Sequence, residues 1–396
     1  MAIALPPPSA PQLSTVEAVQ AGGSEIVTQS WQQDKVHVFG PELVDKALLE
    51  QAISSATDLS DVVRQIESAY FIAGYPAVQV RYARAEPELF VLVLPGKLTK
   101  VVVPEPYTAY FAGLEGADPL TDEKLERART LASIHSDRQG ENPTLEFLPE
   151  EAGTAMVLKA SESGPSPSSL GAEYGNPGNR FSGRHLVNYF ARNGFATGDE
   201  LRVEGRHALT GLDKNSSPSE SYYEHSLIWS RVTTMGLFGL RGRYVGYQQE
   251  VDLDIGVGDR TDFSGNIRQA ELAWVYPLAA SFSSRWNLNS KLDYTRKNYE
   301  IRLLDETVQR QEYGSVEIGT DYARLFDVGG QRVDVTAGVA VRSGLGSDET
   351  DKPIRAADQG YLLFRPTLSV AAPLGESSVI GLSLVAQITD DTLPEQ

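Results

Sequence analysis

Two patterns of hydrophobic and polar positions divide the chain. Between residues 35 and 160, apolar residues recur at both strand and helix spacing, so this part is predicted to mix α and β structure. From Ser168 onward the helical spacing stops. Long segments of alternating apolar and polar residues follow one another there, separated by Gly, Asp, Asn and Ser. The pattern predicts α+β modules followed by an all-β region.

The first module is predicted to span residues 35–96 in the order β-α-α-β-β. Gly40-Pro41 is expected to open its first helix, because proline is tolerated in the first turn. Ser60 is the expected N-cap of the second helix, since its hydroxyl can accept a hydrogen bond from a free backbone N–H. Strands over residues 77–82 and 89–94 are predicted to complete the module.

A second module of similar order is predicted over residues 97–164. Its helix is expected to begin near Leu120, and its closing strands to cover residues 144–148 and 154–159. Two consecutive units of one plan indicate an internal repeat. Residues 1–34 are rich in Pro, Ser, Gly and Gln, so they are predicted to be a linker or a flexible lead-in.

Residues 165–396 contain about eleven alternating segments of about 10–16 residues. The clearest runs from Arg285 to Asp293, with Trp286 and Leu288 on one face and charged or amide side chains on the other. Strands of soluble domains average about 5–6 residues and usually turn their polar face outward. The length, together with aromatic residues near the segment ends, favours the N-terminal part of an antiparallel transmembrane β-barrel over a soluble β-domain.

The polar faces of these segments carry charges of both signs. Six of these charged residues are predicted to face a hydrated lumen: Arg285, Lys291, Glu317, Asp321, Arg332 and Arg342. The alternative for each is a solvated lumen residue with no individual role.

Composition narrows the classes of function. The chain has 396 residues and no cysteine, which excludes disulfides, zinc–thiolate sites and thiol nucleophiles. Its formal net charge of -18 argues against a nucleic-acid partner, because phosphates would be repelled. No apolar run of about 18 residues indicates a transmembrane helix. Met1–Leu5 lacks the basic start of a secretory signal, and Pro6–Pro8 follows at once.

Sites for catalysis or ligands were sought among the polar residues. The five histidines lack metal-ligand spacing. Residues 252–259 resemble part of a calcium loop, but without the glutamate that closes an EF-hand, and an acidic loop is the favoured interpretation. No nucleophile elbow, P-loop or dinucleotide fingerprint occurs in context. No catalytic residue, cofactor or metal is therefore predicted, and the chain is not expected to be an enzyme.

Several short motifs, in this order along the chain, resemble one family. The segment Tyr70–Tyr75 resembles the end of the second helix of a POTRA domain, a polypeptide-transport-associated module. Leu114–Gly116 and Leu148–Thr154 resemble parts of the second POTRA domain of two-partner-secretion transporters. Glu173–Asn176 with Ser182–Arg184, and Thr197–Leu201, resemble the first hairpin and next turn of their barrel. The chain is thus similar to the TpsB, or haemolysin secretion and activation, transporters.

This resemblance implies an outer-membrane protein with periplasmic POTRA modules, a lipid-embedded barrel and one copy per functional unit. The expected activity is translocation of a secreted, extended partner protein, without a cofactor. A POTRA sheet edge can accept such a peptide by strand addition, and Val78, Val80 and Tyr82 are the predicted contacts. The alternative is that this strand only pairs within its own sheet.

The chain departs from the family pattern at its C-terminal end. Family members carry an Arg-Gly-Tyr-type motif on a loop shortly after a Leu-Pro-Glu-like stretch, whereas Leu393–Gln396 is the last segment here. A transporter lacking its C-terminal portion is therefore expected. Three other functions were considered: a barrel-assembly factor of the same superfamily, a passive porin and a soluble adhesin. The two modules over residues 35–160 argue against the porin, and their number favours secretion over barrel assembly.

Overall fold

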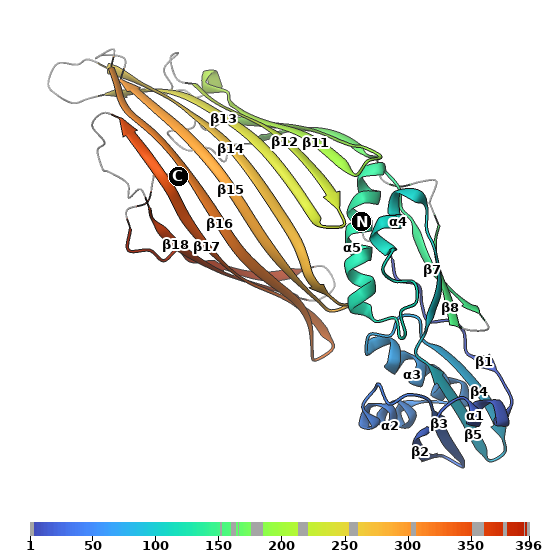
Figure 1. Cartoon of the computed structure of the whole chain (residues 1–396). Coiled ribbons are helices and arrows are strands. Elements are labelled where there is room, and N and C mark those ends of the chain that lie inside the picture. Colours follow the sequence, from blue (N-terminus) through green and yellow to red (C-terminus); the bar gives the residue numbers. More distant parts are fainter. Residues whose placement is uncertain are drawn as a thin grey trace. The chain divides into compact units, whose positions relative to one another are not determined.

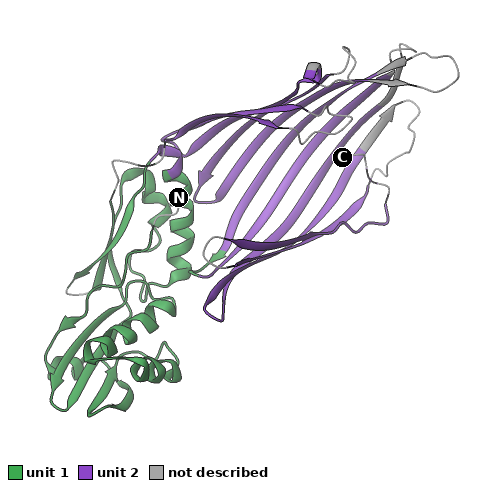
Figure 2. Cartoon of the chain, turned by 180° about the vertical axis from the view of Figure 1, so that it is seen from behind, with its two compact units in different colours: residues 1–136, 141–164, 279–282 green, residues 137–140, 165–278, 283–396 purple. Residues whose placement is uncertain are grey.

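The computed structural model separates into two compact units (Figure 2). Unit 1 consists of residues 1–136, 141–164 and 279–282, and unit 2 of residues 137–140, 165–278 and 283–396. The residues described are 4–150, 153–159, 164, 166–175, 185–212, 221–252, 260–301, 306–350, 360–374, 378–391 and 393.

The first sheet of unit 1 has five strands in the order β1-β4-β5-β3-β2 (Figure 1). The strands are β1 (Gln12–Leu13), β2 (Glu25–Trp31), β3 (Asp34–Phe39), β4 (Gln79–Ala85) and β5 (Glu88–Leu94). Helices α2 (Lys46–Ser55) and α3 (Leu59–Ile72) lie between β3 and β4 in the chain. Elements β3 to β5 therefore follow the predicted order β-α-α-β-β. Their core includes the fully buried Leu49, Ile53, Ile66 and Tyr70.

The prediction of a linker over residues 1–34 was wrong for its second half. Helix α1 (Val16–Ala21) and strand β2 occupy it, and β2 pairs antiparallel with β3. Val27 and Trp31 of β2 are buried in the first core, and Val19 of α1 is fully buried in a smaller cluster with Phe90. These apolar residues stabilise the segment by leaving water, despite its polar composition.

Aspartates cap both helices of the first module, so the expected start of the first helix at Gly40-Pro41 and the expected N-cap Ser60 of the second were wrong. Helix α2 begins at Lys46, where Asp45 Oδ1 accepts a hydrogen bond of 2.9 Å from Ala47 N. Helix α3 begins at Leu59, with Asp58 Oδ1 accepting from Asp61 N at 2.9 Å. An aspartate side chain caps a helix as well as a serine does. The N-cap of α3 is therefore Asp58, which has extended backbone angles, and not Ser60. Gly40, at a φ of +138°, instead forms a turn after β3.

The second sheet of unit 1 has three strands in the order β6-β8-β7. They are β6 (Leu98–Val102), β7 (Thr144–Glu150) and β8 (Gly153–Lys159). Between β6 and β7 lie a short 3-10 helix, η1 (Glu105–Tyr107), then α4 (Thr108–Phe111) and α5 (Asp122–Gln139). This module repeats the plan of the first with a shorter first helix.

Its core contains the fully buried Tyr107, Phe111 and Leu125. The Gln79 side-chain amide donates to Thr154 Oγ1 at 2.8 Å and so joins the two sheets of unit 1.

Unit 2 consists mainly of one sheet of eleven strands (Figure 1). Its order follows the chain from β9 to β19, and each strand with a given register is antiparallel to its neighbour. The strands are β9 (Ser168–Gly175), β10 (Leu186–Gly194), β11 (Asp199–Ala208), β12 (Ser221–Thr233), β13 (Gly236–Asp252), β14 (Arg260–Ala280), β15 (Ser284–Ile301), β16 (Glu306–Val328), β17 (Gln331–Thr350), β18 (Leu362–Pro373) and β19 (Val379–Val385).

The register gives this sheet one apolar and one polar face. Ile318 of β16 lies opposite Ser290 and Val341, on the face that also carries Phe364. Ile318 is 58% exposed. Its neighbour Glu317 points to the other face, since successive side chains alternate.

None of the helices in the described part of the chain combines the length and apolarity that crossing a bilayer requires. Among the same residues, no three His, Asp or Glu side chains gather closely enough to hold a metal ion. Residues 252–259, interpreted as an acidic loop, lie almost entirely outside the described residues, as do Ser182–Arg184 of the predicted first hairpin.

Candidate functional site

The candidate site is the polar face of the eleven-stranded sheet. All six residues predicted to face the lumen lie on it. Lys291 stands opposite Glu317, which stands opposite Arg342, so the register brings these three into one row. The other three lie elsewhere on the same face: Asp321 opposite Asn287, Arg285 opposite Ala323, and Arg332 opposite Asp327. Whether these side chains meet a translocating polypeptide stays a prediction.

Several charges on this face are paired with a side chain of another strand. Lys291 Nζ lies 2.7 Å from Glu271 Oε2 of β14. Arg365 Nη1 of β18 lies 2.8 Å from Glu317 Oε2. Asn287 Nδ2 donates to Asp321 Oδ2 at 2.8 Å. Lys291 therefore binds a side chain of the adjacent strand β14, whereas Glu317 binds Arg365 of β18, two strands away across β17.

One group on this face is buried. Arg342 Nη2 lies 2.9 Å from each carboxylate oxygen of Asp293, and Arg342 Nε donates to Ser315 Oγ at 2.8 Å. Ser315 Oγ donates in turn to Asp293 Oδ1 at 2.9 Å. The exposed fractions of Asp293, Ser315 and Arg342 are 2%, 0% and 8%. Arg342, one of the predicted lumen residues, therefore binds Asp293 and Ser315 and has little contact with solvent.

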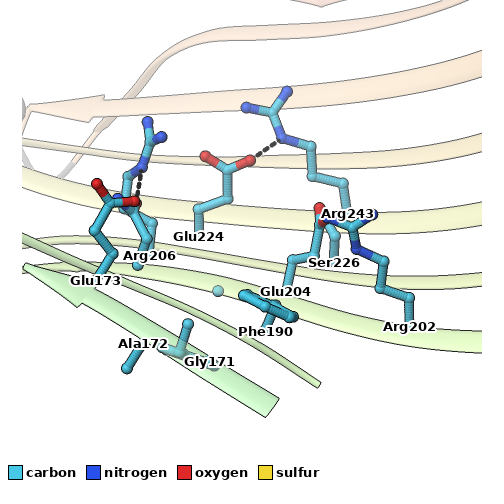
Figure 3. Close-up of a pocket in the computed structure, with 13 residues that line it drawn as sticks. Gly171, Ala172, Glu173, Phe190, Arg202, Glu204, Arg206, Glu224, Ser226 and Arg243 are labelled. Carbon is cyan, nitrogen blue, oxygen red and sulfur yellow. Dashed lines mark hydrogen bonds and ion pairs between the residues drawn. The ribbon is translucent and has the colours of Figure 1, made fainter. Parts of the chain in front are cut away.

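A concave region of about 500 Å³ lies over β9 to β13 on the same face. Figure 3 shows Arg206, Glu224 and Arg243 standing on one side of the ribbon. Arg243 Nε donates to Glu224 Oε1 at 2.7 Å, and Arg206 Nε donates to Asn188 Oδ1 at 2.7 Å. The region also includes Arg202 and Glu204. Its surface carries charges of both signs.

Sequence reasoning did not single out this region. The alternation of Glu200, Arg202, Glu204 and Arg206 along β11 carried the necessary signal, because alternate residues of a strand share one face. Asp293 and Ser315 were not singled out either. Their burial depends on which strands pair and in what register, which alternation within one segment does not specify.

The predicted peptide-binding strand is not a free edge. Strand β4 lies between β5 and the short strand β1, which pairs with it in parallel at Arg81 and Tyr82. Ser14 N donates to Tyr82 O at 2.8 Å. The chain's own N-terminal segment thus covers part of the edge. Since β1 pairs with only two of the seven residues of β4, the cover is short.

The side chains of the predicted contacts point largely into the module. Val78 and Val80 are each 1% exposed and belong to the first core, and Val78 precedes β4. Tyr82 is half-buried against the same core. A peptide added at this edge would therefore contact main-chain groups of β4. One of them is the Tyr82 carbonyl, which points away from β5 and accepts the hydrogen bond from Ser14 N.

Comparison with known proteins decides the family. The family model of the haemolysin secretion/activation protein ShlB/FhaC/HecB matches residues 153–396, from strand β8 through the whole of the eleven-stranded sheet. The chain belongs to this family. The predicted resemblance to two-partner-secretion transporters is thereby confirmed, and it places the chain among outer-membrane secretion proteins rather than in an enzyme family.

Two solved structures support the fold of this family member. CdiB from Escherichia coli matches with a TM-score of 0.65 and 16% sequence identity, over 94% of this chain and 70% of that one. CdiB from Acinetobacter baumannii matches with a TM-score of 0.57 and 13% identity, over 95% of this chain and 71% of that one. The predicted fold class, POTRA modules followed by an antiparallel barrel, is confirmed. No curated protein sequence matches the chain.

Proposed function

We propose that this family member translocates an extended partner protein from the periplasm to the cell surface. The partner is a secreted haemolysin-like or adhesin-like chain. In this proposal unit 1 lies in the periplasm, the apolar face of the sheet contacts outer-membrane lipid, and the polar face lines the path. The protein acts as one copy and needs no cofactor.

The main support for this proposal is the mixed charge on the polar face of the sheet. Its ion pairs join cations and anions of different strands, such as Lys291 of β15 with Glu271 of β14 and Arg365 of β18 with Glu317 of β16. A wall of mixed charge stays hydrated and offers no large field of one sign. A polypeptide of any local charge can therefore pass it without being held strongly at one place.

The outer edge of β4 is the proposed capture site in unit 1. An extended peptide added there would hydrogen-bond to main-chain groups of Val80 and Tyr82, with Val78 at the approach to the strand. Segment 12–14 occupies part of this edge, so it must leave for a longer peptide to pair. Because only two residue pairs are lost, a longer peptide can displace it.

Cysteine labelling in cells tests the proposed path, since the natural chain has no cysteine to interfere. Thr367 lies on the polar face of β18, opposite Gly338, and its neighbour Leu368 lies on the apolar face. A charged, membrane-impermeant maleimide is expected to label Thr367→Cys about tenfold faster than the matched Leu368→Cys, because thiolates form poorly in lipid. Co-expression of a partner chain stalled in transit should slow the labelling of Thr367→Cys. Equal labelling rates for the two variants would contradict the proposed path.

A reversible lock tests the capture site separately. Gln12 and Arg81 are paired residues of β1 and β4, so Gln12→Cys with Arg81→Cys should form a disulfide. Oxidised cells are expected to retain the partner in the periplasm, and reductant to restore secretion to the level of the Gln12→Cys single variant. Normal secretion by the fully oxidised protein would rule out the β4 edge as the capture site, while leaving the transport proposal intact.

A further inference from the structure

On strand β14, the apolar face of the sheet ends at Arg268. From Leu278 back to Ala270, the residues on this face are Leu278, Tyr276, Trp274, Leu272 and Ala270. They extend about 26 Å along the strand at about 3.3 Å per residue, close to the apolar band of a membrane barrel. The next residue on the face is Arg268, followed by Asn266 and Ser264. Arg268 thus stands at the boundary between apolar and polar surface.

Next to Arg268 the apolar face contains a hollow. Three glycines lie on this face of neighbouring strands, and tyrosine rings cover two of them. A Cβ on Gly205 would lie 2.1 Å from the Tyr189 ring, and one on Gly246 would lie 2.4 Å from the Tyr223 ring. A Cβ on Gly242 would meet no atom within 4 Å.

The uncovered glycine forms the floor of this hollow. Gly242 lies opposite Leu227 on one side and Ala270 on the other, so apolar side chains flank it. An apolar groove of about 460 Å³ runs over it, bordered by Val203, Leu227, His225, Tyr244 and Arg268. The groove is therefore apolar along its floor and polar at one end.

The polar end of the groove supplies a cation and aromatic groups. The Arg268 guanidinium lies 5.9 Å from the centre of the Tyr244 ring, a cation–π contact. Within the described part of the chain, no carboxylate lies within ion-pair distance of Arg268. His225 also lines the groove, with its Nδ1 2.9 Å from the Tyr189 hydroxyl and its ring edge-on to that of His207. An anion would complete this arrangement.

We propose that the groove binds one phosphate-bearing membrane lipid. One acyl chain lies over Gly242 between Leu227 and Ala270, and the phosphate lies against Arg268 and the hydroxyl of Tyr244. An acyl chain fits the apolar floor, and a phosphate complements an arginine that has no acidic partner among the described residues. This inference rests on the membrane placement proposed above, and it adds a ligand that translocation itself does not require.

Native mass spectrometry of the purified full chain in detergent tests the site. The probes are diphosphorylated lipid A, the same lipid A without its phosphates, phosphatidylethanolamine and inorganic phosphate. Arg268→Gln removes the cation. Gly242→Leu fills the groove while keeping the cation, and its Cβ would meet no atom within 4 Å. Arg324→Gln is the matched control, because Arg324 also lies over an aromatic ring, that of Phe326 at 5.1 Å, but near the opposite end of its strand.

The unaltered protein is expected to retain one diphosphorylated lipid. Arg268→Gln should weaken retention about tenfold, as the loss of a charge-assisted contact implies, and Gly242→Leu should weaken it as well. Arg324→Gln should leave it within about twofold. Equal retention of phosphate-free lipid A, or equal losses from Arg268→Gln and Arg324→Gln, would overturn the assignment. Solubility without detergent and no binding of any lipid would instead contradict the membrane placement itself.

Discussion

The two units of this chain place polar and apolar residues in opposite ways. In unit 1, Ile66 and Tyr70 are fully buried beneath polar helix surfaces. In the sheet of unit 2, Ile318 is 58% exposed, while Asp293 is 2% exposed on the opposite face. Both units follow one rule, that apolar side chains avoid water. The difference is what the proposed placement requires, with water around unit 1 and lipid on the outside of the sheet of unit 2.

The contrast also explains which interactions hold each unit together. Unit 1 depends on the area of apolar surface removed from water. The polar face of the sheet depends on hydrogen bonds and ion pairs between its strands, which compensate for the burial of charge. Single substitutions can therefore be chosen to damage one unit by a mechanism that the other does not use.

The largest effect is expected for the buried ion pair of the sheet. Arg342→Ala leaves the Asp293 carboxylate buried without its cation, which should lower the free energy of unfolding by about 3–5 kcal/mol. Replacing both charges, Arg342→Met with Asp293→Leu, should cost less than Arg342→Ala alone. Urea unfolding in detergent micelles measures both, with the exposed Arg285→Ala as control. If the double variant were as unstable as Arg342→Ala, the unpaired Asp293 carboxylate would not be the cause of the lost stability.

A matched pair of isoleucines tests the contrast between the units directly. Ile66→Ala should destabilise unit 1 by about 3 kcal/mol, because it leaves a cavity in a closed core. Ile318→Ala should change the stability of unit 2 by less than about 1 kcal/mol, since its side chain faces outward. Hydrogen exchange of each unit in the whole protein reports the two values. Similar losses in the two variants would mean that Ile318 faces a protein surface and not lipid.

The last and smallest expected effect on stability depends on pH and comes from a buried carboxyl in unit 1. Glu67 of α3 is 5% exposed, and burial raises its pKa from the ordinary value of 4.5 to about 7. The folded state then binds more protons than the unfolded state between these two values. Its stability should fall as pH rises from about 4.5 to 7, by up to about 3 kcal/mol.

Glu67→Gln removes this dependence, because the amide does not titrate. The variant is expected to match the unaltered protein near pH 4.5 and to exceed its stability at pH 8. Urea midpoints at both pH values, monitored by the fluorescence of Trp31 in variants that keep only this tryptophan, give the comparison. An equal pH dependence in the two proteins would show that the Glu67 carboxyl is already ionised in the folded state.

Much of the fold could be predicted from local patterns. Strands over residues 144–150 and 153–159 were expected almost at their observed bounds, because alternation and turn residues act within a few positions. The polar faces of β15 to β17 were also predicted correctly. Helix starts were less accurate, since Asp45 and Asp58 compete with nearby residues for the same capping role.

The candidate site was only partly predictable. Lys291, Glu317 and Arg342 were identified as polar-face residues from alternation. The partners that set their behaviour, such as Glu271 and Asp293, come from other strands. The groove beside Arg268 could not be predicted from any single strand. Its floor at Gly242 lies between Leu227 and Ala270, which belong to the two neighbouring strands.

The sequence by itself determined the period of each segment, the two-faced character of the sheet, the order of modules and the family motifs. These depend on residues close together in the chain, whose side-chain directions follow from backbone geometry alone. Only the tertiary structure decided that segment 12–14 covers the edge of β4, and that Asp293 and Arg342 share one buried pair. Such contacts join distant residues, and register and packing select them from many combinations that the local pattern allows equally.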